Sequence, residues 1–139
     1  MGLSRDELVQ VALRHANAEA ENDLATTLAT LEPEPVYDFF PVGRRFVGMA
    51  ATRAYYDHLF STFLPMVSSY ELISEFVNND GVAQEYMIHV RLPDGSEEHH
   101  RVLGILTFGT EALSGERIYG SDRLLELMVG PALAMTQPI

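Results

Sequence analysis

The chain has 139 residues, of which 47% are apolar, and a formal net charge of -11, a composition that fits one globular domain over residues 1–139. The acidic excess repels nucleic acid and anionic membranes, and the absence of cysteine excludes disulfides and thiolate ligands. No apolar run approaches the roughly 20 residues that span a bilayer, and no signal sequence is visible, so we expect a cytoplasmic protein.

The first half of the chain shows helical periodicity interrupted by prolines. Apolar residues recur at helical spacing up to Leu31, with a bend expected near Asn22. Pro33 and Pro35 should end this helix, because proline lacks an amide donor and restricts the residue before it. The predicted elements are a helix over 8–31, a short strand over 36–40, a turn over 41–43 and a helix over 49–63.

The second half reads as a meander of strands followed by one helix. Glycine-containing turns at 79–81, 93–95 and 114–115 separate the extended segments. Ser121 and Asp122 resemble the N-cap and first turn of the last helix, which Gly130 and Pro131 stop. The predicted elements are strands over 70–78, 82–92, 99–108 and 117–121 and a helix over 123–129. Helices followed by antiparallel strands indicate an α+β fold in which the helices cover one face of the sheet.

Alternation along residues 82–92 divides this strand between two faces. Tyr86, Ile88 and the other even-numbered residues make one mostly apolar set, and Glu85, Met87 and His89 lie opposite. Because the helices cover only one face, we expect the apolar set to meet a second copy of the chain in a homodimer.

Four segments together resemble a known superfamily: residues 23–24, 41–43, 46–56 and 116–119. They resemble the nuclear-transport-factor-two-like superfamily, in its SnoaL-like and ketosteroid-isomerase-like branches. The resemblance implies a cone-shaped, curved antiparallel sheet wrapped around a pocket with about three helices, the cystatin-like α+β barrel. It also implies dimerisation through the outer sheet face.

The isomerase branch can be compared residue by residue. Its catalytic aspartate base corresponds to Phe40, its protonated acid to Gly104 and its tyrosine donor to His15, while the supporting tyrosine is retained as Tyr56. An enolate intermediate needs both a base and a donor aimed at the developing charge. The steroid isomerase mechanism is therefore not expected.

The resemblance also predicts which side chains enter the pocket. His89 is the predicted general acid/base, because imidazole exchanges protons near neutral pH. The other predicted catalytic residues are Tyr56, Glu85 and Tyr119. The predicted ligand-binding residues are His15, Phe40, Met87, His100, Arg117 and Ser121.

Each of these predictions has a structural alternative. His89 could be an ordinary strand residue, and His100 part of a solvated hairpin end. His15 and Glu19 have i,i+4 spacing, which suits either a surface pair or two metal ligands. A site made of His15, His89 and His100 lacks any compact ligand motif, so we expect neither a metal nor another cofactor. Ser121 and Asp122 compete for the position of the family aspartate.

These patterns support two functions. The first is a cofactor-free acid/base enzyme, such as a cyclase, isomerase, dehydratase or hydrolase, acting on a small and largely apolar substrate. The alternative is a non-catalytic ligand-binding or dimerisation module, in which the cavity would be apolar or collapsed. A closed pocket with several inward titratable groups would distinguish the enzyme.

Overall fold

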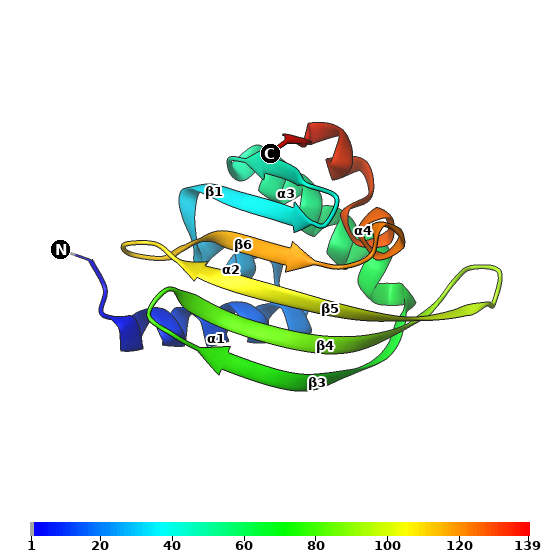
Figure 1. Cartoon of the computed structure of the whole chain (residues 1–139), viewed down its shortest axis with the longest axis horizontal. Helices are drawn as coiled ribbons and strands as arrows, with labels where there is room; N and C mark the ends of the chain where they lie inside the picture. The colour runs from blue at the N-terminus through cyan, green and yellow to red at the C-terminus, as the bar shows by residue number, and fades with distance from the viewer. Residues whose placement is uncertain (1) are drawn as a thin grey trace.

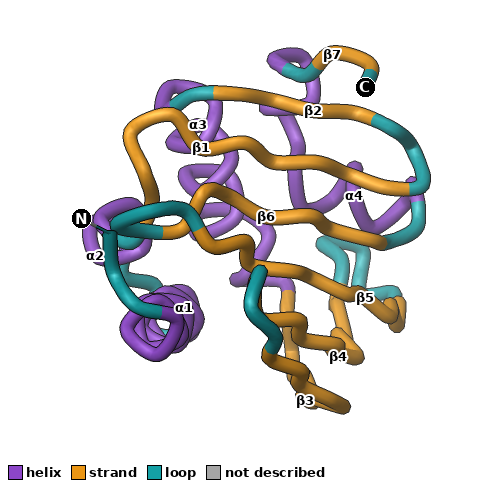
Figure 2. Tube along the Cα trace, turned by 60° about the vertical axis from the view of Figure 1, so that its left-hand side comes forward, coloured by secondary structure: helices purple, strands orange, loops and turns teal. Residues whose placement is uncertain are grey.

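A computed structural model describes residues 2–139 and shows an α+β fold, as predicted. One curved sheet has the strand order β3-β4-β5-β6-β1-β2-β7, and the helices pack against one of its faces (Figures 1 and 2). The sheet stays open and does not close into a barrel. The principal elements are α1 (Arg5–Ala20), α2 (Leu24–Ala29), β1 (Leu31–Phe40), β2 (Arg44–Val47), α3 (Met49–His58), β3 (Val67–Val77), β4 (Gly81–Arg91), β5 (Glu97–Phe108), β6 (Leu113–Tyr119), α4 (Asp122–Val129) and β7 (Gln137–Pro138).

The predicted bent helix is two helices. Ser4 caps α1 through a capping box with Glu7, and α1 ends before Asn22, whose φ of 60° lies in the left-handed region. The side chain of Asp23 then accepts a hydrogen bond from the Thr26 amide and begins α2. The expected bend is therefore a complete break.

The prolines lie inside a strand, contrary to the prediction. β1 begins at Leu31 and includes Pro33 and Pro35. Its parallel pairing with β6 is interrupted between Leu31 and Val36, and its pairing with β2 starts only at Val36. In the stretch that holds the prolines, no neighbouring strand accepts hydrogen bonds from the backbone. Proline, which lacks the amide hydrogen, is therefore tolerated there. β2 lies in a stretch for which no element was predicted.

The predicted helix over 49–63 changes its winding at its C-terminal end. After His58 the chain continues as a π-helical turn, η1 (Leu59–Phe63), and a short 3₁₀ turn, η2 (Leu64–Met66). π-helical turns are rare and are often found at functional sites. Here the turn delivers Leu59 and Phe63 to the wall of an internal cavity.

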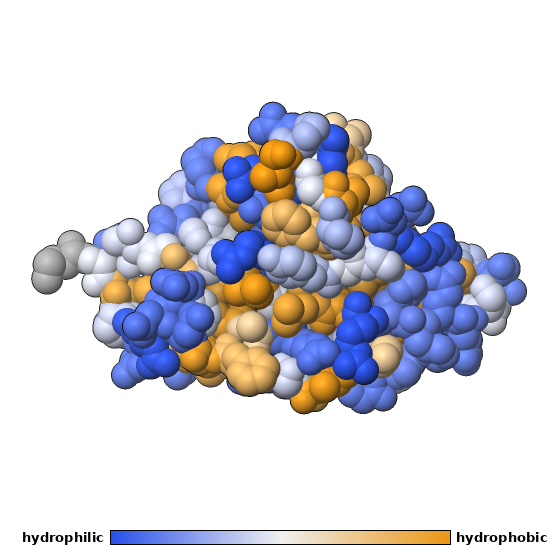
Figure 3. All heavy atoms as spheres, in the orientation of Figure 1, coloured by the Kyte–Doolittle hydropathy of each residue, from blue (hydrophilic) through white to orange (hydrophobic). Residues whose placement is uncertain are grey.

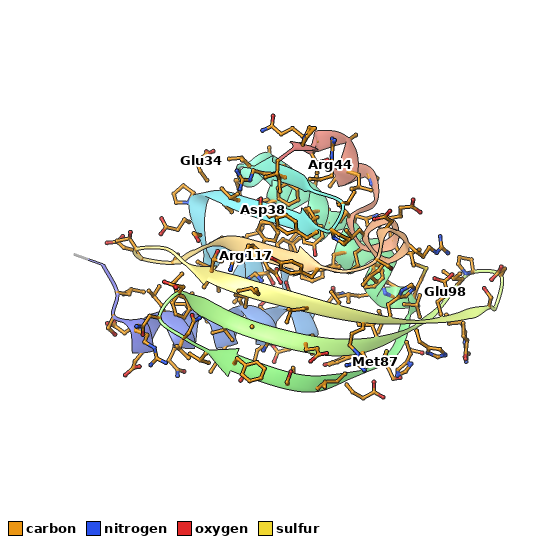
Figure 4. All side chains as sticks on the ribbon, in the orientation of Figure 1. Glu34, Asp38, Arg44, Met87, Glu98 and Arg117 are labelled. Atoms are coloured by element: carbon orange, nitrogen blue, oxygen red, sulfur yellow. The ribbon has the colours of Figure 1, made fainter. Side chains whose placement is uncertain are left out.

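The two faces of β4 are exchanged relative to the prediction. Tyr86 and Ile88 line the cavity on the helix side, and Val90 is buried. Met87, like Asp38 and Arg117, projects from the outer face (Figure 4). The expectation that the apolar set faces outward is wrong, because burying it against the helices removes more apolar surface from water. Figure 3 views the outer face, where apolar and charged side chains are mixed.

Candidate functional site

A cavity of about 160 Å³ lies between α1, η1 and the concave side of the sheet. Apolar side chains make up most of its wall, and polar groups gather at one end, where α1 faces β6. Tyr70, on the edge strand β3, is 56% exposed and marks the open rim. The lining residues include His15, Ala16, Glu19, Tyr55, Leu59, Phe63, Tyr70, Gln84, Tyr86, Ile88, Val102, Gly104, Leu106, Glu116, Ile118 and Met128.

His15, one of the predicted ligand-binding residues, lies at the polar end of the cavity, and its hydrogen bonds fix its tautomer. The side chain is 1% exposed, and Nδ1 lies 2.7 Å from Thr30 Oγ1. The Thr30 hydroxyl donates its hydrogen to the Thr27 carbonyl oxygen at 2.6 Å, so it must accept from His15 Nδ1–H. Nε2 is therefore the ring nitrogen that can gain or lose a proton.

Two groups converge on Nε2 of His15. Tyr56 Oη and Glu19 Oε1 each lie 3.0 Å from it, and Tyr37 Oη lies 2.6 Å from Tyr56 Oη. A neutral imidazole accepts from the Tyr56 hydroxyl, whereas a protonated imidazole donates to the Glu19 carboxylate. Burial raises the pKa of Tyr37 and Tyr56 well above 10.0, so both hydroxyls keep their protons.

Glu116 of β6 faces this pair across the cavity. Burial raises the pKa of its carboxyl group well above 4.5, and the negative charge of Glu19 adds to the effect. Among residues 2–139 no group donates a hydrogen bond to the Glu116 side chain. Its Oε2 lies against Gly104, and a Cβ added there would crowd the carboxyl group in this position. Glycine at 104 therefore makes room for the acid.

His15, Glu19 and Glu116 are also residue types that can bind a metal ion. One potential ligand atom from each of His15, Glu19 and Glu116 lies within 4.8 Å of the others, the one such group among residues 2–139. However, Nε2 of His15 already has hydrogen-bond partners in Glu19 and Tyr56. This pattern favours a proton relay. The three-histidine site is ruled out by geometry, because His89 lies on the other side of the sheet.

Three predicted site residues on β4 lie outside the cavity. Glu85 accepts hydrogen bonds from Ser74 and Arg101 at 2.9 and 2.8 Å, which lower its pKa below 4.5. His89 contacts Glu71 at 2.9 Å and His99 at 2.6 Å on the outer face. Met87 lies between them on the same face. Their predicted roles required inward side chains, so we do not assign them to the site.

The one-residue shift recurs on the last long strand. Glu116 and Ile118 face the cavity, whereas Arg117 and Tyr119 face outward. Tyr119 stacks on Phe40 with ring centroids 5.2 Å apart, which places Phe40 on the outer face as well. The predictions that these three residues enter the pocket are therefore wrong.

The remaining predicted residues occupy other structural positions. Tyr56 is fully buried and lies one hydrogen bond behind the cavity wall. His100 contacts Glu98 at 2.8 Å, and Glu98 has a pKa lowered to about 2 by Arg123 and His100. Ser121 is the N-cap of α4, accepting from the Leu124 amide at 3.1 Å, and Asp122 opens its first turn. Neither Ser121 nor Asp122 enters the cavity.

The sequence patterns did not indicate Glu116 as a site residue, and they left Glu19 as a partner of His15 in either a surface pair or a metal site. The signal was present in the alternation Glu116, Ile118 against Arg117, Tyr119, because Ile118 belongs to the core. The position-by-position comparison with the isomerase branch placed that branch's protonated acid at residue 104, which is glycine in this chain. It could not show that the adjacent strand supplies a carboxyl group to the same place.

A model of the SnoaL-like domain matches residues 12–113. This match spans most of the chain, from the second half of α1 through β4 and β5. The chain belongs to the SnoaL-like family. The family lies within the NTF2-like superfamily, so the predicted resemblance is confirmed. Comparison with curated proteins finds no match.

Solved structures share the fold at low sequence identity. An NTF2-like protein of unknown function from Cytophaga hutchinsonii is 10% identical, with a TM-score of 0.68 over 82% of this chain and 99% of its own. A protein from Bacillus subtilis whose name suggests an isomerase is 15% identical, with a TM-score of 0.68 over 92% and 96%. A cystatin-like protein from Silicibacter pomeroyi is 14% identical, with a TM-score of 0.64 over 89% and 79%. At these identities the likeness shows the fold alone. In the SnoaL-like chain described here, no helix within residues 2–139 is both long and apolar enough to cross a membrane.

Proposed function

We propose that this SnoaL-like protein is a small-molecule enzyme that transfers protons with its own side chains. The observation that carries the proposal is the His15–Glu19 pair facing Glu116 across one end of a largely apolar cavity. Active sites place acids and bases of perturbed pKa in such clefts. The reaction classes that suit the arrangement are isomerisation, cyclisation, dehydration and hydrolysis of a small, largely apolar substrate.

The proposed roles follow from the hydrogen bonds. Glu19 is half-exposed to the cavity and accepts a substrate proton, which His15 can share through Nε2. Glu116 keeps its proton in the free protein and contacts the polar atom of the substrate. Tyr56 is a positioning residue, because it touches His15 and lies behind the cavity wall.

A probe reaction tests the proposal without knowledge of the natural substrate. 5-Nitrobenzisoxazole is a neutral bicyclic compound that opens to a coloured phenolate when a base removes its C–H proton. We expect the wild-type protein to open it with saturable kinetics above the buffer rate, measured by absorbance. His89→Gln should retain this rate, because His89 lies on the outer face. No rate above buffer for the wild type would contradict the proposal.

The second candidate function is a non-catalytic ligand-binding module. It is favoured by the outward direction of Glu85 and His89, which that function predicts. The cavity, however, is neither collapsed nor wholly apolar. A protein that binds 5-nitrobenzisoxazole without opening it would support this second candidate.

We also propose that the outer sheet face forms a symmetric homodimer. Tyr119 is 40% exposed and stacks on Phe40, and half-buried Leu103, Ile105 and Met87 surround them on neighbouring strands. A second copy would bury these groups. Light scattering after size exclusion should give about twice 15.5 kDa at micromolar concentration. Tyr119→Glu should shift the protein to the monomer, and a wild-type monomer would reject the proposal.

A further inference from the structure

The charged side chains at the polar end of the cavity are mainly acidic. Glu19 and Glu116 both line it, the chain contains no lysine, and within residues 2–139 no arginine lines the cavity. His15 is the one basic group there, and its Nε2 already contacts Glu19. A carboxylate or phosphate ligand would meet two acids and find no free cation.

Glu116 lacks a partner of opposite charge. The polar residues that line the cavity together with Glu116 are Glu19 and His15 from α1, Tyr55 from α3, Tyr70 from β3, and Gln84 and Tyr86 from β4. Within residues 2–139 none of these donates a hydrogen bond to its carboxyl group. An ionised carboxylate in such surroundings is costly unless a cation pairs with it. A ligand that brings a positive charge would supply this partner.

Aromatic rings surround the remainder of the space. Phe63, Tyr55, Tyr70 and Tyr86 belong to the wall, and the rings of Tyr70 and Tyr86 meet edge to face with centroids 5.9 Å apart. The faces of aromatic rings attract organic cations, and the rings also pack against apolar groups. Cavities of about 150 Å³ admit a molecule the size of benzene, and this cavity measures about 160 Å³.

We propose that the cavity binds a small lipophilic amine in its ammonium form, with the nitrogen between Glu116 and Glu19 and an apolar, ring-sized body against the aromatic wall. This inference rests on the proposed function only in placing the ligand in the same cavity. The ammonium group donates to both carboxylates, so Glu116 releases its proton when the amine enters. The aliphatic side of the ligand meets Ile88 and Val102.

Three compounds with the same ring and different head groups test the ligand class. Benzylamine, benzyl alcohol and benzoate are titrated into ¹⁵N-labelled protein, and amide chemical shifts report both the affinity and the place of binding. We expect benzylamine to bind at least about tenfold tighter than benzyl alcohol, a difference of about 1.4 kcal/mol. Benzoate should not bind. The shifts should cluster at residues 15–20, 84–88 and 116–118.

A matched pair of variants separates Glu116 from general surface charge. Glu116→Gln should reduce the preference for benzylamine over benzyl alcohol to about twofold or less, whereas Glu71→Gln should leave it unchanged, because Glu71 lies on the outer face. Calorimetry in two buffers of different ionisation enthalpy should show release of about one proton per benzylamine bound, and none from Glu116→Gln.

The proposal fails if benzyl alcohol or benzoate binds as tightly as benzylamine. It also fails if Glu116→Gln keeps the wild-type preference, or if the shifts lie on the outer face. These results are independent of proton-transfer activity. Opening of 5-nitrobenzisoxazole without amine binding would overturn the ligand class alone, and amine binding without ring opening would overturn the enzyme proposal alone.

Discussion

Replacing Glu19 with glutamine is expected to lower the rate of 5-nitrobenzisoxazole opening by about 100- to 10,000-fold. The amide has nearly the same shape but cannot accept the substrate proton. Its amide can accept a hydrogen bond from the protonated ring at His15 Nε2 or donate one to the neutral ring, so the ring should keep its place. The measurement is kcat/KM by absorbance, with folding checked by circular dichroism.

Glu71→Gln is the matched control for this experiment. Glu71 contacts His89 Nε2 at 2.9 Å, much as Glu19 contacts His15 at 3.0 Å, but its pair lies outside the cavity. The rate of the Glu71→Gln variant should equal that of the wild type.

The loss of Glu19 also affects Glu116. Because Glu19 helps to keep Glu116 protonated, removing Glu19 makes Glu116 easier to ionise, and Glu116 could then act as a substitute base. The double variant Glu19→Gln/Glu116→Gln removes that route. Full activity in the double variant would eliminate the carboxyl pair as the base.

Most of the fold could be predicted from local sequence patterns. Helical spacing, glycine turns and the N-cap at Ser121 gave the order of elements, and the SnoaL-like resemblance supplied the curved sheet. The errors came where tertiary pairing overrides local preference. Pro33 and Pro35 normally end regular structure, but the irregular stretch of β1 accommodates them without losing a ladder hydrogen bond.

The site residues were harder to predict from the sequence, because side chains alternate between the two faces of a strand with a period of two residues. A shift of one residue exchanges every inward side chain for an outward one. The predicted set Glu85, Met87, His89 and the observed set Gln84, Tyr86, Ile88 differ by this single shift. Burial decides between the two sets. Apolar residues belong on the face that the helices cover, whereas Glu85 pairs with Arg101 and His89 pairs with Glu71 on the outer face.

His15 lines the cavity, and Tyr56, which was predicted to enter it, lies directly behind His15. A helix fixes the direction of both side chains without reference to neighbouring strands. Glu116 needed the sheet register as well. Its carboxyl reaches Gly104 from the adjacent strand, and no comparison of one position at a time can show that contact. The acid comes from β6, and the glycine that leaves space for it comes from β5.

Replacing Glu116 with glutamine is expected to stabilise the folded protein at neutral and alkaline pH. The pKa of Glu116 is raised in the folded state, so between its unfolded and folded pKa values the folded chain binds more protons. The wild type therefore loses stability as the pH rises through this window, by about 1.4 kcal/mol per pH unit. Glutamine carries no such charge and avoids the loss. The gain should shrink towards zero as the pH falls below 4.5, where Glu116 is protonated in both the folded and the unfolded wild type.

Urea unfolding of both proteins from pH 5.5 to 9 measures this effect while staying above the pI of about 4.7. The difference in unfolding free energy should grow with pH and then level off at the folded pKa of Glu116. Glu85→Gln is the control: Arg101 and Ser74 lower the pKa of Glu85, so its contribution is fully present above pH 4.5 and is lost only on further acidification, and its difference from the wild type should stay constant between pH 5.5 and 9. A difference between wild type and Glu116→Gln that does not change with pH would mean that Glu116 ionises normally. The cavity would then carry two negative charges in the free protein, and a proton held at Glu116 would have no part in its chemistry.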